Sequence, residues 1–264
     1  MTRAIAKTTL RGLLYARSSY ALFALAVVVS LFMFSSLVYM QMAQEAGEAQ
    51  MLTKMRAGGL QSALGFWHTV VTIFGLYLGA TAVGSEAKTK TIVTVLARPV
   101  PRWQFLAGKS LGLLTFLFAF LALGVAGALV LIAYWDLSYS ALLWLGMAEL
   151  FVELVFLTGA SLGLGAMLSP VAAGSLAFFL TLLPSLVRHT AEHPNLALRW
   201  LSRLAYFLSP ARMDQDLLGQ SFDRELLNPD YSLYAQVLAE NLLYTLVVMV
   251  VGCVVFTRRD VPLK

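Results

Sequence analysis

The sequence has little of what a water-soluble protein needs on its surface. Charged residues make up only 12% of the 264 positions, about half the share typical of soluble domains, whereas 59% of the residues are hydrophobic. Glycine and proline occur at ordinary counts of 19 and 8, so a fibrous or disordered chain is excluded. Together with a mean hydropathy of +0.76, this composition predicts an integral membrane protein.

Cysteine and histidine are also scarce, with one and three residues respectively. Cys253 lies inside an apolar run, so it cannot form a disulfide within the chain and leaves no cysteine-based metal framework. The three histidines, His68, His189 and His193, are scattered and cannot be assembled into a metal cluster or a nucleophile–base pair. We therefore expect no catalytic residue, no metal site and no cofactor on this chain.

Long apolar runs are abundant instead. A helix needs roughly 20 apolar residues to cross a bilayer core of about 30 Å. Six runs approach this length, at about 21–40, 64–83, 110–133, 141–168, 170–187 and 237–257. Their continuous apolarity favours helices over barrel strands, which alternate at every second residue. The predicted fold is an all-α membrane protein with six transmembrane helices and a tight turn at Ser169-Pro170.

Lysine and arginine predict the orientation of these helices. Most of the 19 basic residues fall in the segments 1–20, 84–109 and 258–264. The positive-inside rule therefore places both termini in the cytoplasm, in a protein of the cytoplasmic (inner) membrane. The net charge of +5 then reflects topology and indicates no nucleic-acid partner. The segment 188–236 is expected outside, with short helices along the membrane.

The first 20 residues carry an amphipathic pattern. Arg3, Lys7 and Arg11 recur at every fourth position, and Ile5 and Leu10 belong to an apolar side. This pattern is typical of a basic helix that lies in the headgroup plane of the lipid bilayer. Residues 1–20 are thus predicted to form an interfacial helix. Whether it is only a topological anchor or has a mechanical role stays open.

The sequence contains two apparent catalytic or nucleotide-binding motifs, and each lacks a residue that its chemistry requires. Gly108-Lys109-Ser110 matches the end of a phosphate-binding P-loop, but Trp103 stands where that loop needs its first glycine, so the chain has no ATP site of its own. Ser161 lies in a G-x-S-x-G pattern, yet no histidine is placed to activate it. Gly159 and Gly163 are better interpreted as a helix-contact face, and the same spacing occurs at Gly75/Gly79 and Gly108/Gly112.

Glu149 and Glu153 are the most informative polar pair. They lie four residues apart, on one face of the predicted fourth span, at a depth where a carboxylate costs a few kcal/mol unless it is protonated, paired or hydrated. Two interpretations are open: a translocation path or cation or proton site, or an interhelix hydrogen bond at a dimer contact. His68 in the second span is expected to donate a hydrogen bond to another helix rather than to bind a metal.

The segment 84–109, predicted to be cytoplasmic, is basic and partly amphipathic. A short apolar patch precedes the break at Arg98-Pro99 and comprises Ile92, Val93, Val95 and Leu96. A loop that only connected helices would have no use for an apolar patch facing the cytosol. The patch therefore suits docking into a groove of a soluble partner, the alternative being that it packs back on the inner rim of the bundle.

These parts occur in a recognisable order. A basic amphipathic N-terminus precedes the first span, a Thr-rich stretch leads into Leu-Ala-Arg-Pro-Val-Pro-Arg-Trp-Gln at 96–104, and Arg258-Arg259-Asp260 follows the last span. In this order the sequence resembles the type-2 ABC transporter permeases (ABC-2). The subgroup that looks most similar contains the permease of nitrous-oxide-reductase maturation and related multidrug or lipid exporters.

The resemblance implies a partner set. Two permease copies would pair, as a homodimer in the simplest case, and two separate ABC ATPase subunits would bind ATP and Mg. The stretch 86–97 would be a coupling helix seated in a groove of the ATPase, with the Ser169-Pro170 turn as a smaller contact. The candidate coupling residues are Glu86, Lys88, Ile92, Val93, Leu96, Arg98, Pro99, Arg102 and Trp103.

The expected function is therefore the permease subunit of an ABC exporter, which couples ATP hydrolysis by its partner to substrate movement across the membrane. One alternative is a membrane-embedded enzyme, which is disfavoured because no nucleophile–base pair can be assembled. The other is a proton-coupled secondary transporter that uses Glu149 and Glu153. Such a transporter predicts an inverted repeat, which the sequence does not show.

Overall fold

The computed structural model describes residues 2–15, 49–88, 101–190 and 231–258. It also describes the isolated positions 20, 24, 28, 195–197, 199–200, 203 and 221–222. Most of the predicted first span, 21–40, lies outside the described residues. The same holds for the centre of the predicted coupling segment, 89–100, and for most of the predicted external segment, 188–236.

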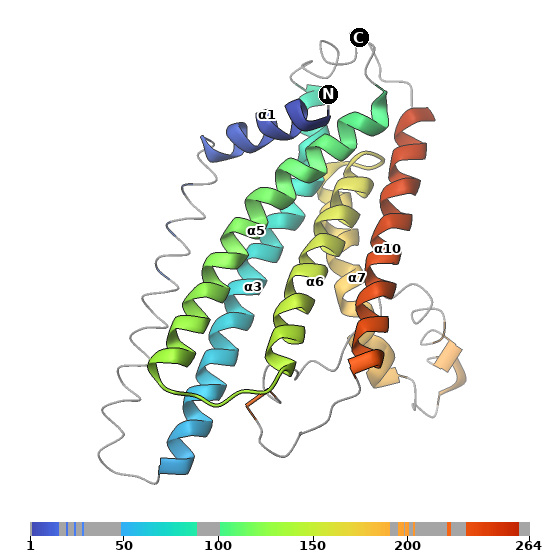
Figure 1. Ribbon diagram of the computed structural model, residues 1–264. Coiled ribbons are helices and arrows are strands. Elements are labelled where there is room, and N and C mark those ends of the chain that lie inside the picture. Colours follow the sequence, from blue (N-terminus) through green and yellow to red (C-terminus); the bar gives the residue numbers. More distant parts are fainter. Residues whose placement is uncertain are drawn as a thin grey trace.

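Helices make up all the regular structure of the described residues, and no strand occurs among them. In chain order the helices are α1 (Thr2–Leu14), α3 (Ala49–Lys88), α5 (Arg102–Tyr134), α6 (Leu142–Gly165), α7 (Pro170–Thr190) and α10 (Tyr231–Arg258). The last five form a bundle, and α1 crosses α5 near the N-terminal end of that helix (Figure 1). For the described part of the chain, the expectation of an all-α protein is confirmed.

Four of these helices contain stretches long and apolar enough to cross a membrane. The stretches are Met55–Val83, Trp103–Tyr134, Leu142–Gly165 and Ala235–Phe256. They overlap the second, third, fourth and sixth predicted spans. The fifth predicted span, 170–187, coincides with α7, in which the apolar stretch Pro170–Leu180 is shorter.

Two helices extend well beyond the apolar runs that marked them. Helix α3 begins at Ala49 rather than near 64 and continues to Lys88, and α5 begins at Arg102 rather than near 110. Hydropathy locates the part of a helix that suits lipid, whereas the backbone hydrogen bonds continue through polar residues as well. Helix α5 starts directly after Pro101, which has no N–H to donate and fits the beginning of a helix.

The link between α6 and α7 is short, although α6 ends three residues before the predicted position 168. Helix α6 ends at Gly165 and α7 begins at Pro170. The Ala172 amide donates to Ser169 Oγ at 3.4 Å, and the Ala173 amide donates to the Ser169 carbonyl at 2.9 Å. The serine thus caps α7, and the two helices are held as neighbours.

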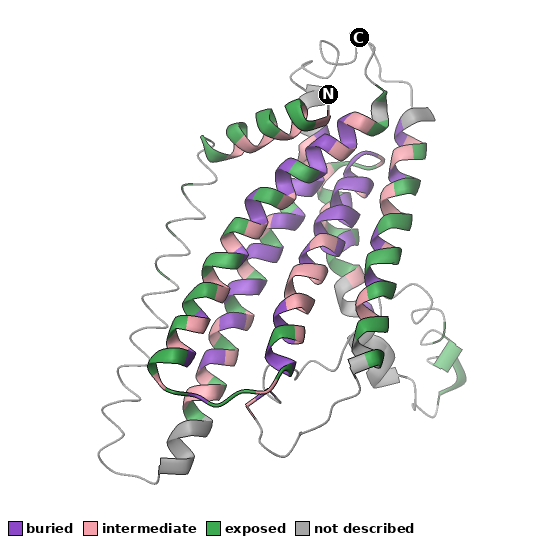
Figure 2. Cartoon of the chain, viewed as in Figure 1, coloured by how far each residue is buried: buried purple, intermediate pink, exposed green. Residues whose placement is uncertain are grey.

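Burial divides the helices of the bundle into inner and outer faces (Figure 2). The largest cluster of buried side chains joins α3, α5, α6 and α10, with Leu117 and Leu154 fully buried within it. The outer face of α10 exposes a row of large apolar side chains, namely Leu242, Leu243, Leu246, Val247, Val250, Val251 and Val254. An exposed apolar stripe of this length is unfavourable in water and suits contact with lipid or another membrane helix.

Glycines set how closely the helices approach, as the G-x-x-x-G spacing predicts. A methyl group at Gly75 of α3 would lie 2.7 Å from Thr158 Oγ1 of α6, and one at Gly79 would collide with Ser161 of α6. On the other side of α6, Gly163 faces Gly252 of α10. These small residues let backbones meet where larger side chains would hold them apart, so the predicted contact faces are confirmed.

The third glycine pair, Gly108 and Gly112 of α5, receives α1. Methyl groups at these positions would lie 2.8 Å from Ile5 Cβ and 2.8 Å from the Ala6 carbonyl oxygen. The crossing of α1 and α5 is therefore a close contact between backbones. It fixes the N-terminal helix against the bundle.

One end of the bundle collects several features that are far apart in the sequence. Helix α1, the C-terminal end of α3, the N-terminal end of α5, the α6–α7 turn and the C-terminal end of α10 all lie there (Figure 1). This is the end at which the sequence places the cytoplasmic segments. The opposite end holds the connection from Tyr134 to Leu142.

Candidate functional site

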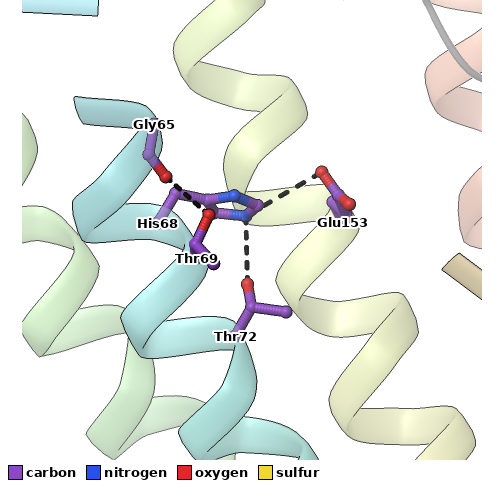
Figure 3. A network of polar contacts seen from close by, with 5 residues as sticks. All are labelled: Gly65, His68, Thr69, Thr72 and Glu153. Atoms are coloured by element: carbon purple, nitrogen blue, oxygen red, sulfur yellow. Dashed lines mark hydrogen bonds and ion pairs between the residues drawn. The ribbon is translucent and has the colours of Figure 1, made fainter. Parts of the chain in front are cut away.

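A polar contact lies inside the bundle, between α3 and α6. His68 of α3 is 7% exposed, and its Nε2 lies 3.9 Å from Glu153 Oε2 of α6. The same nitrogen lies 3.3 Å from Thr72 Oγ1, one helical turn along α3. Figure 3 shows the imidazole between the two partners.

The helix geometry explains why these groups meet. His68 and Thr72 are four residues apart and therefore lie on one face of α3, as Glu149 and Glu153 do on α6. Nearer the α6–α7 turn, the contact of Gly79 with Ser161 brings the same two helices together. The register of that close contact places His68 opposite Glu153.

Pairing reduces the cost of a carboxyl group at this depth. The side chain of Glu153 is 30% exposed and that of His68 only 9%. An isolated carboxylate within a membrane costs a few kcal/mol, and an imidazole within ion-pair distance offsets part of that cost. Chemically, the pair can share a proton or hold two helices together. His68 meets a second helix as expected, but the contact with Glu153 at 3.9 Å is an ion-pair distance and not the expected hydrogen bond. The roles of Glu149 and Glu153 stay predictions.

Nothing in the described part of the chain points to a metal centre. Among the described residues there is no group of three or more His, Cys, Asp or Glu side chains that could hold a metal ion. The His68–Glu153 pair alone offers only one nitrogen and one carboxylate, fewer ligands than a structural zinc site uses.

The candidate coupling residues are only partly within the described chain. Glu86 and Lys88 belong to the last turn of α3, and Arg102 is the first residue of α5. Trp103 is 54% exposed. The central candidates lie outside the described residues, namely Ile92, Val93, Leu96, Arg98 and Pro99. The two helix ends that flank them lie at the same end of the bundle (Figure 1).

The structure explains why the two rejected motifs cannot act as such. Gly108, Lys109 and Ser110 lie inside α5, whereas a P-loop is a loop that precedes a helix. Lys109 is 8% exposed, and its Nζ lies 5.8 Å from the centre of the Phe105 ring. Ser161 is fully buried, and its hydroxyl donates to the Thr158 carbonyl at 3.0 Å, so it is not presented to any substrate.

Sequence reasoning missed a polar residue of the bundle interior. Asn241 of α10 is 8% exposed, and its Oδ1 has no hydrogen-bond partner within the described residues. Its backbone carbonyl accepts a bond of 2.8 Å from the Thr245 hydroxyl. The available signal was an asparagine within the apolar run 237–257, where polar side chains commonly face the interior of a helix bundle.

Taken together, long apolar helices, a lipid-compatible outer face and polar groups turned inward define a membrane protein that crosses the bilayer several times. Residues 3–261 match the family model described as "ABC-2 family transporter protein". The chain therefore belongs to the ABC-2 family and is a membrane component of an ABC transporter. A search of curated protein sequences gave no match.

Proposed function

We propose that this chain is the permease subunit of an ABC exporter, in which two permease copies pair and two separate ATPase subunits bind at the end of the bundle that holds α1. ATP hydrolysis on those subunits moves the helices between inward-facing and outward-facing states. The observation that carries the proposal is the match to the ABC-2 family over 3–261.

The arrangement of α3 and α5 supports coupling through the segment between them. Both helices are long, with 40 and 33 residues, and both continue from the membrane to the ends that flank 89–100. A force applied to this segment would therefore be passed along two stiff helices that reach the far side of the bundle. Because α3 also contacts α6 and α7, their positions would change with it.

The charge distribution supports the proposed location of the ATPases, at the end of the bundle that holds α1. Arg3, Lys7 and Arg11 of α1 lie at the end of the bundle where α3 ends and α5 begins. The positive-inside rule assigns this end to the cytoplasm, where ATP is available. The membrane would then be the cytoplasmic membrane.

Co-purification tests the ATPase contact. Charge reversal at Arg98 combined with deletion of 92–96 should abolish recovery of the ATPase with a tagged permease. The control Arg199→Glu changes an exposed arginine elsewhere in the chain and should leave recovery unchanged. Undiminished recovery with the first variant would remove the docking segment from the proposal, whereas equal loss with both variants would mean that the loss reports general misassembly and not the docking segment.

A further inference from the structure

One face of helix α1 packs against helix α5 of the bundle. Its partly buried residues lie toward α5, namely Thr2, Ile5, Ala6, Thr9, Leu10 and Leu13. Ile5 sits against Gly108, and Ala6 and Thr9 sit against Gly112. The helix is therefore held in a fixed position and presents a fixed outer face.

That outer face carries charge of one sign. Arg3, Lys7 and Arg11 are all exposed, and residues 1–20 contain no aspartate or glutamate. At a rise of 1.5 Å per residue, the three cations form a row with a spacing of about 6 Å. Within the described part of the chain, no carboxylate forms an ion pair with any of them.

The level of α1 along the bundle indicates what the row faces. Gly108 and Gly112 lie in the first three turns of the apolar stretch Trp103–Tyr134, so α1 crosses α5 where this stretch begins. Leu14 and Tyr15 at the end of α1 are 52% and 80% exposed. An apolar and an aromatic side chain beside a row of cations match the boundary between headgroups and acyl chains.

We propose that Arg3, Lys7 and Arg11 form a binding surface for the phosphate groups of anionic phospholipids in the leaflet that α1 faces. The fixed contact with α5 makes this a built site, since the cations keep their spacing without lipid. A lipid surface suits the row better than an acidic protein does, because the adjoining Leu14 and Tyr15 need an apolar neighbour. The proposal does not depend on the ATPase contact.

Lipid retention by the full-length chain tests the site. The purified protein is exchanged from detergent into mixed phosphatidylglycerol and phosphatidylcholine, and the lipids retained by the protein are counted by native mass spectrometry. The triple variant Arg3→Gln, Lys7→Gln and Arg11→Gln should retain phosphatidylglycerol more than tenfold less well, since each cation near a lipid surface contributes about fivefold in affinity. Phosphatidylcholine retention should not change.

Two further variants separate the site from net charge and from misfolding. The triple variant Arg56→Gln, Arg199→Gln and Arg203→Gln, which removes the same charge elsewhere in the chain, should retain phosphatidylglycerol as the unaltered chain does. Ala4→Glu with Thr8→Glu adds acids to the exposed face of α1 and should weaken retention while the α5 contact stays intact. Equal retention by all variants would overturn the proposal. It would also be overturned if the first triple variant lost only its ATPase, since the occupant would then be a protein.

Discussion

His68 and Glu153 illustrate how a single pair of side chains can depend on the whole bundle. The two residues are 85 positions apart and meet at 3.9 Å. The sequence marks Glu149 and Glu153 because carboxyl groups are rare inside membranes, and it marks His68 as the histidine within a predicted span, but it does not show that His68 meets Glu153. That pairing depends on the register between α3 and α6, which the glycine contacts set.

Replacing His68 by alanine should destabilise the protein by about 1–3 kcal/mol, because the contact between His68 and the partly buried Glu153 carboxylate is then lost. The measurement is thermal unfolding in detergent, followed by intrinsic tryptophan fluorescence. The double variant His68→Ala with Glu153→Gln should lose less stability than the two single variants lose together, as is usual for residues in contact.

Thr69→Ala is the matched control for this position. Thr69 is the next residue on α3, is exposed, and donates only to its own helix, at 2.8 Å to the Gly65 carbonyl (Figure 3). Its removal should change stability little. Strictly additive effects of His68→Ala and Glu153→Gln would show that the pair contributes no coupling energy.

At the scale of helices, the sequence predicts contact faces better than helix ends. The spacing at Gly75/Gly79, Gly108/Gly112 and Gly159/Gly163 marks three contacts that the structure contains. The spacing does not indicate which helix each face meets, because the three glycine pairs contact three different helices, α6, α1 and α10 respectively. The ends of α3 and α5 lie outside the apolar runs, where hydropathy carries no information about backbone hydrogen bonds.

Gly79→Ala should weaken the contact of α3 with α6 by about 1–3 kcal/mol, the usual cost of overpacking a closely packed interface. The added methyl group would meet the Ser161 hydroxyl and lie 2.9 Å from the Thr158 carbonyl oxygen, which the backbone cannot easily move. Gly65→Ala on the same helix meets nothing within 4 Å and should be neutral or stabilising. Unfolding in a titration with denaturing detergent distinguishes the two, and equal midpoints would contradict the contact.

Gly112→Ala should loosen α1, because the methyl group would lie 2.8 Å from the Ala6 carbonyl oxygen and equally close to Thr9 Cβ. Amide hydrogen exchange in Thr2–Leu14 should then speed up by tenfold or more, while exchange in α6 stays slow. Gly127→Ala, also on α5, has open space around it and serves as the control. Unchanged exchange in α1 after Gly112→Ala would show that other contacts hold this helix.

At the scale of the whole molecule, the distribution of charge and the arrangement of the helices point to the same topology. Residues near the two described termini, Thr2 and Arg258, lie at one end of the bundle together with the helix ends that flank 89–100 (Figure 1). The apolar runs could not supply this arrangement alone, since they fix neither which helices are neighbours nor how they tilt. The basic residues predict which end of the bundle faces the cytoplasm, because lysine and arginine in short loops stay on the cytoplasmic side.

Cysteine labelling tests which end of the bundle faces the cytoplasm. In a Cys253→Ala background, which removes the one native cysteine, Thr8→Cys on α1 and Tyr139→Cys in the connection between α5 and α6 place exposed thiols at opposite ends of the bundle. A membrane-impermeant maleimide added to intact cells should label Tyr139→Cys and not Thr8→Cys, and lysis should expose the latter. Because α1 lies at the end where α3 ends and α5 begins, labelling of Thr8→Cys from outside would put 89–100 on the side without ATP. The proposed coupling to an ATPase would then be physically impossible, whatever family the chain belongs to.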